Sequence, residues 1–253
     1  MPRPFVLAES TWEEIRSQRF EIAILPWGAT EAHNTHLPYA TDNLETEAIA
    51  VASAALAWEQ GARVLVLPCV PFGVNTGQRD VPFCLNMMPS TQIAVLRDLL
   101  PSLERHGVRK LVILNGHGGN DFKQIIRELQ PATPMLLAQV NWYQVVPATE
   151  HFDDPGDHAG ELETSVTMHL RPDLVRSLES AGSGAARKNR VQAFREGWAW
   201  MPRPWTQVTD DTGVGNPARA SAEKGKTYLD AVAQKLASFW SDLAAADPAE
   251  LYH

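Results

Sequence analysis

The feature that most constrains the fold is an alternation of short apolar runs with longer segments of helical length. The runs are rich in Val, Ile and Leu, end at Pro, Asn or a polar turn, and occupy residues 21–26, 63–68, 109–115 and 135–140. Such continuous apolar runs are typical of strands in a sheet that is buried on both faces. Segments of helical length follow the first three runs, at residues 43–59, 90–106 and 121–129. Because crossovers between parallel strands are right-handed, the alternation predicts an α/β fold with a mostly parallel sheet covered by helices.

Local signals predict where the helices begin and end. Ser90 is expected to cap the second helix, and Gly107 to stop it after a last-turn His. Pro101 lies inside that helix and is expected to kink or split it. A final amphipathic helix is expected at about residues 218–245.

The least regular stretch is residues 182–216. It carries Trp198, Trp200 and Trp205 among Arg, Pro and Gly residues. We expect it to form either a lid or an oligomer contact.

Charge and cysteine content limit the class of protein. The formal net charge of -8 argues against nucleic acid as a partner, since a phosphate backbone is bound by clustered Lys and Arg, and favours a small-molecule substrate. The two cysteines, Cys69 and Cys84, are too few for a disulfide framework or a thiolate metal site. No window approaches the roughly 18 to 20 apolar residues of a membrane span. We therefore expect a cytoplasmic protein without a membrane partner, in which any metal is held by His and carboxylate.

The first chemical motif follows the first predicted strand. Ligands of a doubly wound sheet bind beyond the carboxyl ends of its strands, where Glu31 and His33 lie, and Asp42 follows nine positions later. One imidazole and two carboxylates from a loop suit Zn²⁺ or Mn²⁺. The alternative is a polar loop without a metal. His36 could be a ligand, a hydrogen-bond partner of a ligand or a structural residue, and the structural role is favoured.

The second motif, at residues 115–120, follows the third predicted strand. Glycines on both sides of His117 allow a sharp turn that leaves the imidazole exposed at the strand end, and an Asn can fix the turn. The motif lacks the Lys-Ser/Thr pair and the glycine spacing of phosphate-binding loops.

The third motif, at residues 157–165, leads into an apolar helical stretch. Glu161 and Glu163 are two residues apart, so on a helix at most one can easily face a common site. We assign Glu161 to the helix N-terminus, where an acid complements the helix dipole, and treat His158 and Glu163 as site candidates. Together the three motifs supply enough ligands for two metal ions that share a carboxylate and activate a water.

These motifs together resemble the creatininase (creatinine amidohydrolase) family. The matching segments span nearly the whole chain, at residues 28–33, 37–38, 41–42, 115–120, 158–165, 213–217 and 222–226. The resemblance implies one α/β/α domain over residues 1–253 and homo-oligomers, commonly hexamers or dimer-based assemblies. It also implies two divalent metal ions, usually zinc or manganese with iron as a third option. The implied reaction is hydrolysis of a C–N amide bond in a small, cyclic or formylated substrate.

The same resemblance implies roles for individual residues. It makes Glu31, His33, Asp42 and His117 metal ligands, with Asp42 as the bridge. It makes His158 the residue that delivers a proton to the leaving nitrogen.

Departures from the family pattern concern one ligand and the substrate pocket. Creatininase has a ligand carboxylate where this chain has Gly119, so Glu163 is expected to be the fifth ligand and to take part in catalysis. The motif at residues 32–36 is altered, and residues 77–83 replace a segment that carries a His in the family. Four residues are candidates for substrate binding: His36, Arg79, Asn120 and Trp142.

Two other functional interpretations remain open at this point. One is a catalytically silent binding or scaffold protein, which Gly119 favours. The other is a metallophosphoesterase, for which Arg79, Lys188 and Arg190 are the available phosphate-binding residues.

Overall fold

The computed structural model describes residues 3–252, and the two ends of the expected 1–253 domain lie outside the described residues. The described chain contains a four-stranded, all-parallel sheet in the order β2-β1-β3-β4. Its strands are β1 (Ile22–Trp27), β2 (Val64–Val66), β3 (Lys110–Asn115) and β4 (Leu136–Asn141). Each strand comes from one of the four apolar runs, so the predicted parallel sheet is confirmed, with β2 shorter than its run.

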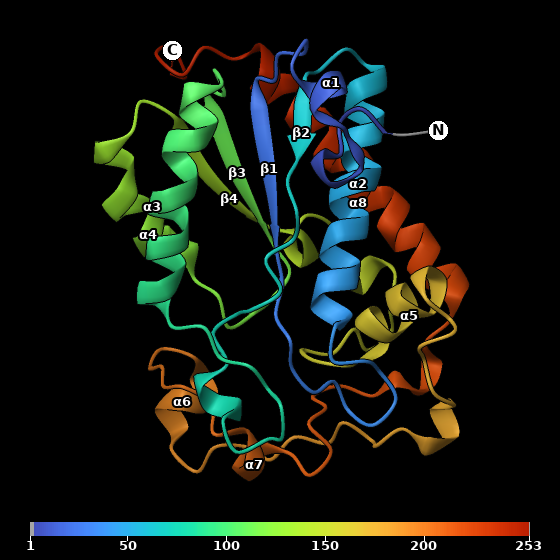
Figure 1. Cartoon of the computed structure of the whole chain (residues 1–253). Helices are drawn as coiled ribbons and strands as arrows, with labels where there is room; N and C mark the ends of the chain where they lie inside the picture. Colours follow the sequence, from blue (N-terminus) through green and yellow to red (C-terminus); the bar gives the residue numbers. More distant parts are fainter. Residues whose placement is uncertain (1–2, 253) are drawn as a thin grey trace.

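Helices cover both faces of the sheet (Figure 1). One layer contains α2 (Thr41–Glu59), α5 (Glu161–Leu170) and α8 (Ala222–Ala245), and the other contains α3 (Pro89–Arg105) and α4 (Phe122–Leu129). Side chains alternate along a strand, so Ile22 and Ile24 pack in the first layer while Ala23 and Leu25 pack in the second. The predicted three-layer α/β/α architecture is therefore confirmed.

The remaining helices are short. The α-helices among them are α1 (Trp12–Ile15), α6 (Gln192–Glu196) and α7 (Trp205–Val208). The 3₁₀ turns are η1 (Leu7–Glu9), η2 (Thr76–Gln78), η3 (Gln130–Ala132), η4 (Trp142–Gln144), η5 (Ala148–Glu150), η6 (Leu178–Ser180) and η7 (Pro217–Arg219).

Two predicted helix starts are wrong. The first helix begins at Thr41, so Asp42 belongs to its first turn and not to a loop. The helix dipole favours an acid in the first turn. Ser90 does not cap α3, because the helix already begins at Pro89, whose missing N–H costs nothing at a first helical position.

Two further boundaries also differ from the sequence prediction. Pro101 does not split α3, which continues to Arg105. Pro101 is exposed, and so is Arg97, whose carbonyl would otherwise accept from the backbone N–H of residue 101, so water can replace that hydrogen bond. The predicted last helix is two elements, since the turn η7 precedes α8 and the Ser221 hydroxyl accepts from the Lys224 N–H at the start of α8.

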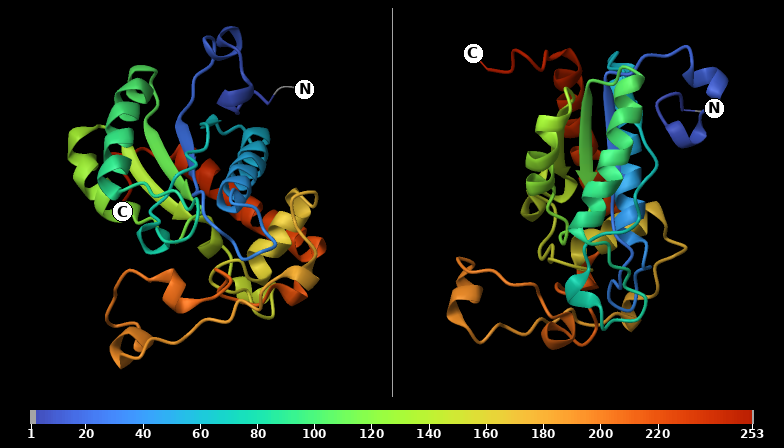
Figure 2. Two further views of the ribbon diagram at one scale, coloured as in Figure 1. Left: turned by 60° about the horizontal axis from the view of Figure 1, so that its bottom comes forward. Right: turned by 60° about the vertical axis from the view of Figure 1, so that its left-hand side comes forward.

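The carboxyl ends of the parallel strands point toward the edge where α6 and α7 lie (Figure 1). We call residues 186–208 the arm. It leaves and rejoins the body where the Arg187 N–H donates to the Val208 carbonyl at 2.7 Å, and it projects beyond the rest of the chain (Figure 2). None of the helices within residues 3–252 is long and apolar enough to cross a membrane. Both cysteines are free thiols, with Cys84 buried.

Candidate metal centre

Six potential ligands from the three motifs meet at the carboxyl edge of the sheet. Two follow β1, one lies in the first turn of α2, one follows β3, one precedes α5, and one lies in the first turn of α5. They form three overlapping groups, Glu31–His33–His158, Glu31–Asp42–His117 and His33–Asp42–Glu163, within each of which the ligand atoms lie within 4.8 Å of one another. Five of the six are at most 6% exposed. The structure thus brings together all the residues that the sequence selected as ligands.

Asp42 belongs to both of the last two groups. Its Oδ1 is 2.9 Å from His33 Nε2, and its Oδ2 is 3.0 Å from His117 Nδ1. The buried Oδ2 has no hydrogen-bond partner within the described chain. One carboxylate therefore directs its two oxygens to two different imidazoles, as a carboxylate shared by two ions would.

The backbone fixes the orientation of the three imidazoles. His33 Nδ1 lies 3.1 Å from the Glu31 carbonyl, His117 Nε2 lies 3.1 Å from the Val74 carbonyl, and His158 Nε2 lies 2.8 Å from the Ala32 carbonyl. A carbonyl only accepts hydrogen bonds, so each of these nitrogens carries the proton. In a neutral ring the other nitrogen then presents a lone pair to the carboxylates, an arrangement that a cation satisfies.

The charges of the cluster shift its pKa values strongly. Burial lowers the pKa of His33, but the charge of Asp42 and the contact with it outweigh burial and raise that pKa to about 10. Burial also lowers the pKa of His117, but the charges of Glu31 and Asp42 and the contacts with them outweigh burial and raise that pKa well above its usual value. Burial raises the pKa of Glu163. The buried acids therefore need a compensating positive charge. In the metal-free protein a protonated imidazole supplies it, and a bound divalent ion would supply it instead.

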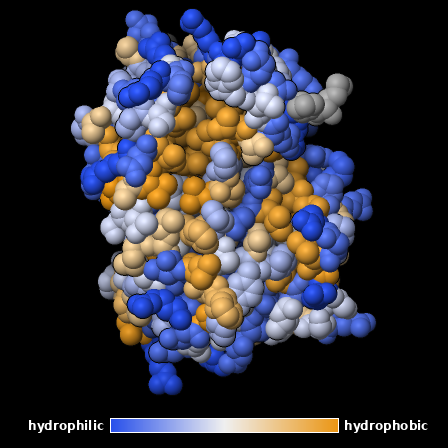
Figure 3. All heavy atoms as spheres, viewed as in Figure 1, coloured by the Kyte–Doolittle hydropathy of each residue, from blue (hydrophilic) through white to orange (hydrophobic). Residues whose placement is uncertain are grey.

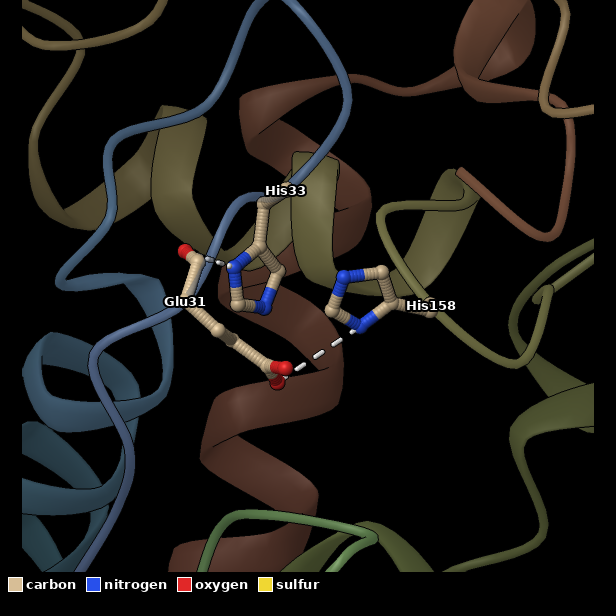
Figure 4. A group of neighbouring side chains, drawn as sticks. All are labelled: Glu31, His33 and His158. Carbon is tan, nitrogen blue, oxygen red and sulfur yellow. Dashed lines mark hydrogen bonds and ion pairs between the residues drawn. The ribbon is translucent and has the colours of Figure 1, made fainter. Parts of the chain in front are cut away.

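His158 stands beside this cluster at the border of the cleft. Its ring centroid is 4.1 Å from that of His33, and its Nδ1 lies 3.8 Å from Glu31 Oε1 (Figure 4). On its other side the indole of Trp205 packs edge-on, with ring centroids 4.8 Å apart. Nδ1 is thus directed toward the cluster by a ring that its neighbours hold in place.

The two glutamates of α5 separate as the helix geometry predicts. Glu163 Oε2 accepts from the Ala159 N–H and lies 3.9 Å from His33 Nε2. Glu161 points elsewhere, because its carboxylate accepts from the Asp154 N–H and the Lys224 ammonium.

Gly119 stands at a position with no room for a side chain. A Cβ at this position would lie 2.3 Å from the Val74 carbonyl oxygen and 2.5 Å from His117 Nε2. No side chain fits there with this backbone, so residue 119 cannot supply a carboxylate. Glu163, whose carboxylate lies 3.9 Å from His33 Nε2, stays the predicted fifth ligand.

Sequence reasoning missed Gln78 and Cys84. The Gln78 amide donates to Glu31 Oε2, the Cys84 thiol donates to Gln78 Oε1 at 3.0 Å, and the Ala32 N–H donates to the thiol sulfur at 3.2 Å. This chain of contacts fixes one oxygen of Glu31, while Oε1 lies 2.9 Å from His117 Nδ1. The only available signal was the divergent segment 77–83.

Glu45 was also missed. It lies one turn after Asp42 on α2, and its Oε1 accepts from the Thr167 hydroxyl at 2.8 Å. Burial, with the charge of Glu163 nearby, raises its pKa well above the usual value. Burial therefore favours the protonated form of Glu45. The three-residue spacing from Asp42 on one helix face was a usable signal.

The structure separates the four candidates for substrate binding. Asn120 lines the cleft, but its Oδ1 accepts from the Val74 N–H and its Nδ2 donates to Asn115 Oδ1, so it fixes loops. Arg79 is exposed and does not line the cleft. Trp142 is 1% exposed and belongs to the core.

His36 lies behind the cluster rather than in the cleft. Its Nε2 is 2.8 Å from the Thr164 hydroxyl, and burial together with the charge of His33 lowers its pKa to about 4. A neutral, fully buried ring of this kind supports the structural role that the sequence favoured.

The cluster forms one wall of an open cleft of about 1830 Å³. The opposite wall is the arm, including Arg187, Arg203 and Trp205. The arm packs closely on η2, since a Cβ at Gly77 would lie 1.9 Å from the Arg203 carbonyl oxygen.

A known family combines this fold with this sequence. The sequence model of creatininase, described as creatinine amidohydrolase, matches residues 8–240. The chain belongs to the creatininase family. Family membership and the amide-hydrolysing names of its relatives make it a hydrolase of the class that acts on C–N bonds, with candidate metal-binding residues at the strand ends.

Several known proteins are similar to this chain over most of its length. One is a Bacteroides fragilis NCTC 9343 protein of known crystal structure, provisionally described as a creatinine amidohydrolase. Its sequence is 45% identical, the match covers 100% of both chains, and the TM-score is 0.93. A mycofactocin precursor peptide peptidase from Mycolicibacterium smegmatis is 30% identical over 88% of this chain and 85% of its own length. Creatinine amidohydrolase from Pseudomonas putida is 26% identical over 94% and 96%, respectively.

Two solved creatininase structures share the fold. One is a mutant creatininase described as the Zn-Zn type, and the other is described as a Mn creatininase. Their TM-scores are 0.78 and 0.77, at 23% and 24% identity. Each aligns with 96% of this chain and 100% of its own.

Proposed function

We propose that this chain is a metal-dependent hydrolase that cleaves a C–N amide bond in a small substrate. The observation that carries the proposal is the position of Asp42, whose two carboxylate oxygens face two separate imidazoles inside a buried acidic cluster. Relatives named for creatinine and for a precursor peptide support an amide as the bond that is broken.

The donor set fits two divalent ions, zinc or manganese. Glu31, Asp42 and His117 would hold one ion, and His33, Asp42 and Glu163 the other. Ions at these positions would lower the pKa of a water and supply hydroxide near neutral pH. Oxygen and imidazole donors with no thiolate match both metals.

His158 is the proton donor in this proposal. Its Nε2–H is committed to the Ala32 carbonyl, so a proton on Nδ1 is the one available to the departing nitrogen. The packing of its ring between His33 and Trp205 keeps that nitrogen at the border of the cleft.

The size of the cleft favours an amide larger than creatinine. Its volume of about 1830 Å³ exceeds the roughly 300–1,000 Å³ of typical small-molecule pockets. A peptide or a formamide with an extended second group fits such a cleft better than a small ring.

A substrate panel tests the proposal. Protein loaded with Zn²⁺ or Mn²⁺ is assayed on cyclic amides, formamides, short peptides and phosphate esters. We expect turnover of at least one amide class that is lost on metal removal and regained on reloading. Preferential turnover of phosphate esters would instead identify a metallophosphoesterase.

A further inference from the structure

The arm is basic although the chain is acidic. Residues 186–208 contain five Lys or Arg residues and a single acid, Glu196, in a chain whose net charge is -8. The five basic residues all line the cleft: Arg187, Lys188, Arg190, Arg195 and Arg203. In the space-filling view, hydrophilic side chains gather over the part of the chain that carries α6 (Figure 3).

Three of these five cations already have partners. Arg187 pairs with Asp210, and Arg203 pairs with Asp157. The Arg195 guanidinium donates to the backbone carbonyls of residues 189 and 190, at 2.7 and 2.8 Å. These contacts shape the arm and its junction with the body.

Lys188 and Arg190 differ from the other three. Neither side chain has an acidic or hydrogen-bonding partner within residues 3–252, although both line the cleft that contains the cluster. The arm places positive charge on its side of the cleft, whereas three of the five acids of the lining lie in the cluster. Local positive charge of this kind attracts anions and raises their local concentration. Divalent ions bound at the cluster would add to this charge rather than cancel it.

We infer that the substrate carries an anionic group, a carboxylate or a phosphate, at a distance from the scissile amide, and that Lys188 and Arg190 bind this group. The inference rests on the proposed function, because it assumes amide hydrolysis at the cluster across the cleft. An Arg beside a Lys suits either anion, since guanidinium forms paired hydrogen bonds and ammonium supplies a compact charge.

The open shape of the cleft agrees with this arrangement. The scissile bond must reach the buried cluster, and an anion at the far end of a longer substrate reaches the arm. Lys188 and Arg190 are exposed to solvent on the arm, so an anion that enters the open cleft can reach both.

Matched substrates test the inference. Three compounds share one hydrolysable amide and end in a carboxylate, a phosphate or a neutral methyl ester. With metal-loaded protein we expect kcat/KM for at least one anionic compound to exceed that for the ester by at least about 10-fold, as expected for a charge-assisted contact. The advantage is expected to shrink as salt is added, and the two anionic arms identify the preferred anion.

Charge reversal assigns the effect to the arm. In the double variant Lys188→Glu and Arg190→Glu, we expect KM for the anionic compound to rise at least about 10-fold, with the ester and the bound metal unaffected. The matched control is Arg105→Glu with Lys235→Glu, an equal charge change at two exposed residues outside the cleft. The control is expected to behave as wild type.

The outcomes separate the inference from the proposed function. If no amide is hydrolysed, the proposed function fails. If amides are hydrolysed but the charged and neutral compounds react equally at low salt, only the anion inference is overturned. It is also overturned if the arm variant changes the oligomer mass in light scattering and leaves substrate preference intact, because the arm is then a contact with a second copy of the chain.

Discussion

The metal cluster and the arm form opposite walls of one cleft, yet the cluster is buried and the arm is exposed. Within the cluster, Asp42 is 2% exposed and His33 fully buried, whereas Trp198 and Trp200 of the arm are 74% and 83% exposed. The cluster stands on strand ends and on the first turns of helices that belong to the core. The arm is tied to the body mainly at its base. In our proposal the chemistry therefore belongs to the buried wall and substrate selection to the arm.

The largest effect is expected from removing the charge of Asp42. Asp42→Asn removes the charge that both ligand groups share, so we expect loss of both ions and a fall in kcat/KM of at least about 10⁴-fold. Metal content and turnover are measured on the same preparation. Asp121→Asn is the control, because Asp121 lines the cleft and caps α4 without joining the cluster. An active Asp42→Asn enzyme with two ions bound contradicts the bridging role.

Removing His158 separates catalysis from metal binding. Since its proposed task is proton delivery, His158→Ala is expected to keep its metal while kcat falls about 10²- to 10⁴-fold. A loss limited to substrates with poor leaving groups would strengthen the assignment. Full turnover on every substrate would refute it.

Gln78 connects the two walls, because η2 contacts both Glu31 and the arm. Gln78→Leu leaves Glu31 Oε2 without its donor, and we expect metal affinity or activity to fall about 10- to 100-fold. Gln130→Leu removes a comparable amide, which bonds to Met135 and Leu137 far from the cluster. Equal losses of metal affinity in both variants would show a general effect on folding instead.

The pKa of His33 predicts how metal binding depends on pH. Its value of about 10 in the metal-free protein means that a proton must leave before a metal binds, so apparent affinity should rise by up to about tenfold per pH unit between pH 6 and 9. The raised pKa also stabilises the metal-free fold below about pH 6.5, and this contribution is lost as pH rises toward 10. Competition titrations and melting curves in chelator measure both effects. An affinity independent of pH would contradict the protonated state.

The smallest effects on activity are expected from the tryptophans of the arm. They should differ between its base, which carries Trp205, and its tip, which carries Trp198. Trp205→Ala removes the ring that packs on His158, so kcat/KM should fall about 2- to 10-fold. Trp198→Ala should leave steady-state kinetics unchanged, because Trp198 does not line the cleft. Similar losses in both variants would indicate that the tip of the arm also reaches the site.

The sequence predicts those parts of the molecule that depend on short-range patterns. Apolar runs are sufficient for the four strands, and the strand-end rule is sufficient to select Glu31, His33 and His117 as neighbours. The helical offset of Glu161 and Glu163 correctly predicts that one of them points away from the cluster.

Contacts between distant segments could not be predicted in this way. Gln78 meets Glu31 across 47 positions, at the end of the short turn η2, whose sequence has no regular pattern. Trp142 was a plausible stacking residue by its type alone, and only its packing against Tyr228 of the distant helix α8 places it in the core. The burial of Glu45 likewise depends on α5, whose Thr167 supplies its hydrogen bond.

Metal content tests the central claim most directly. Protein purified without added metal is analysed for its elements, stripped with chelator and titrated with Zn²⁺ and with Mn²⁺ while amide turnover is followed. The account predicts two divalent ions per chain and activity that returns as the sites refill. A protein that is isolated without metal, binds neither ion and hydrolyses amides regardless would contradict it.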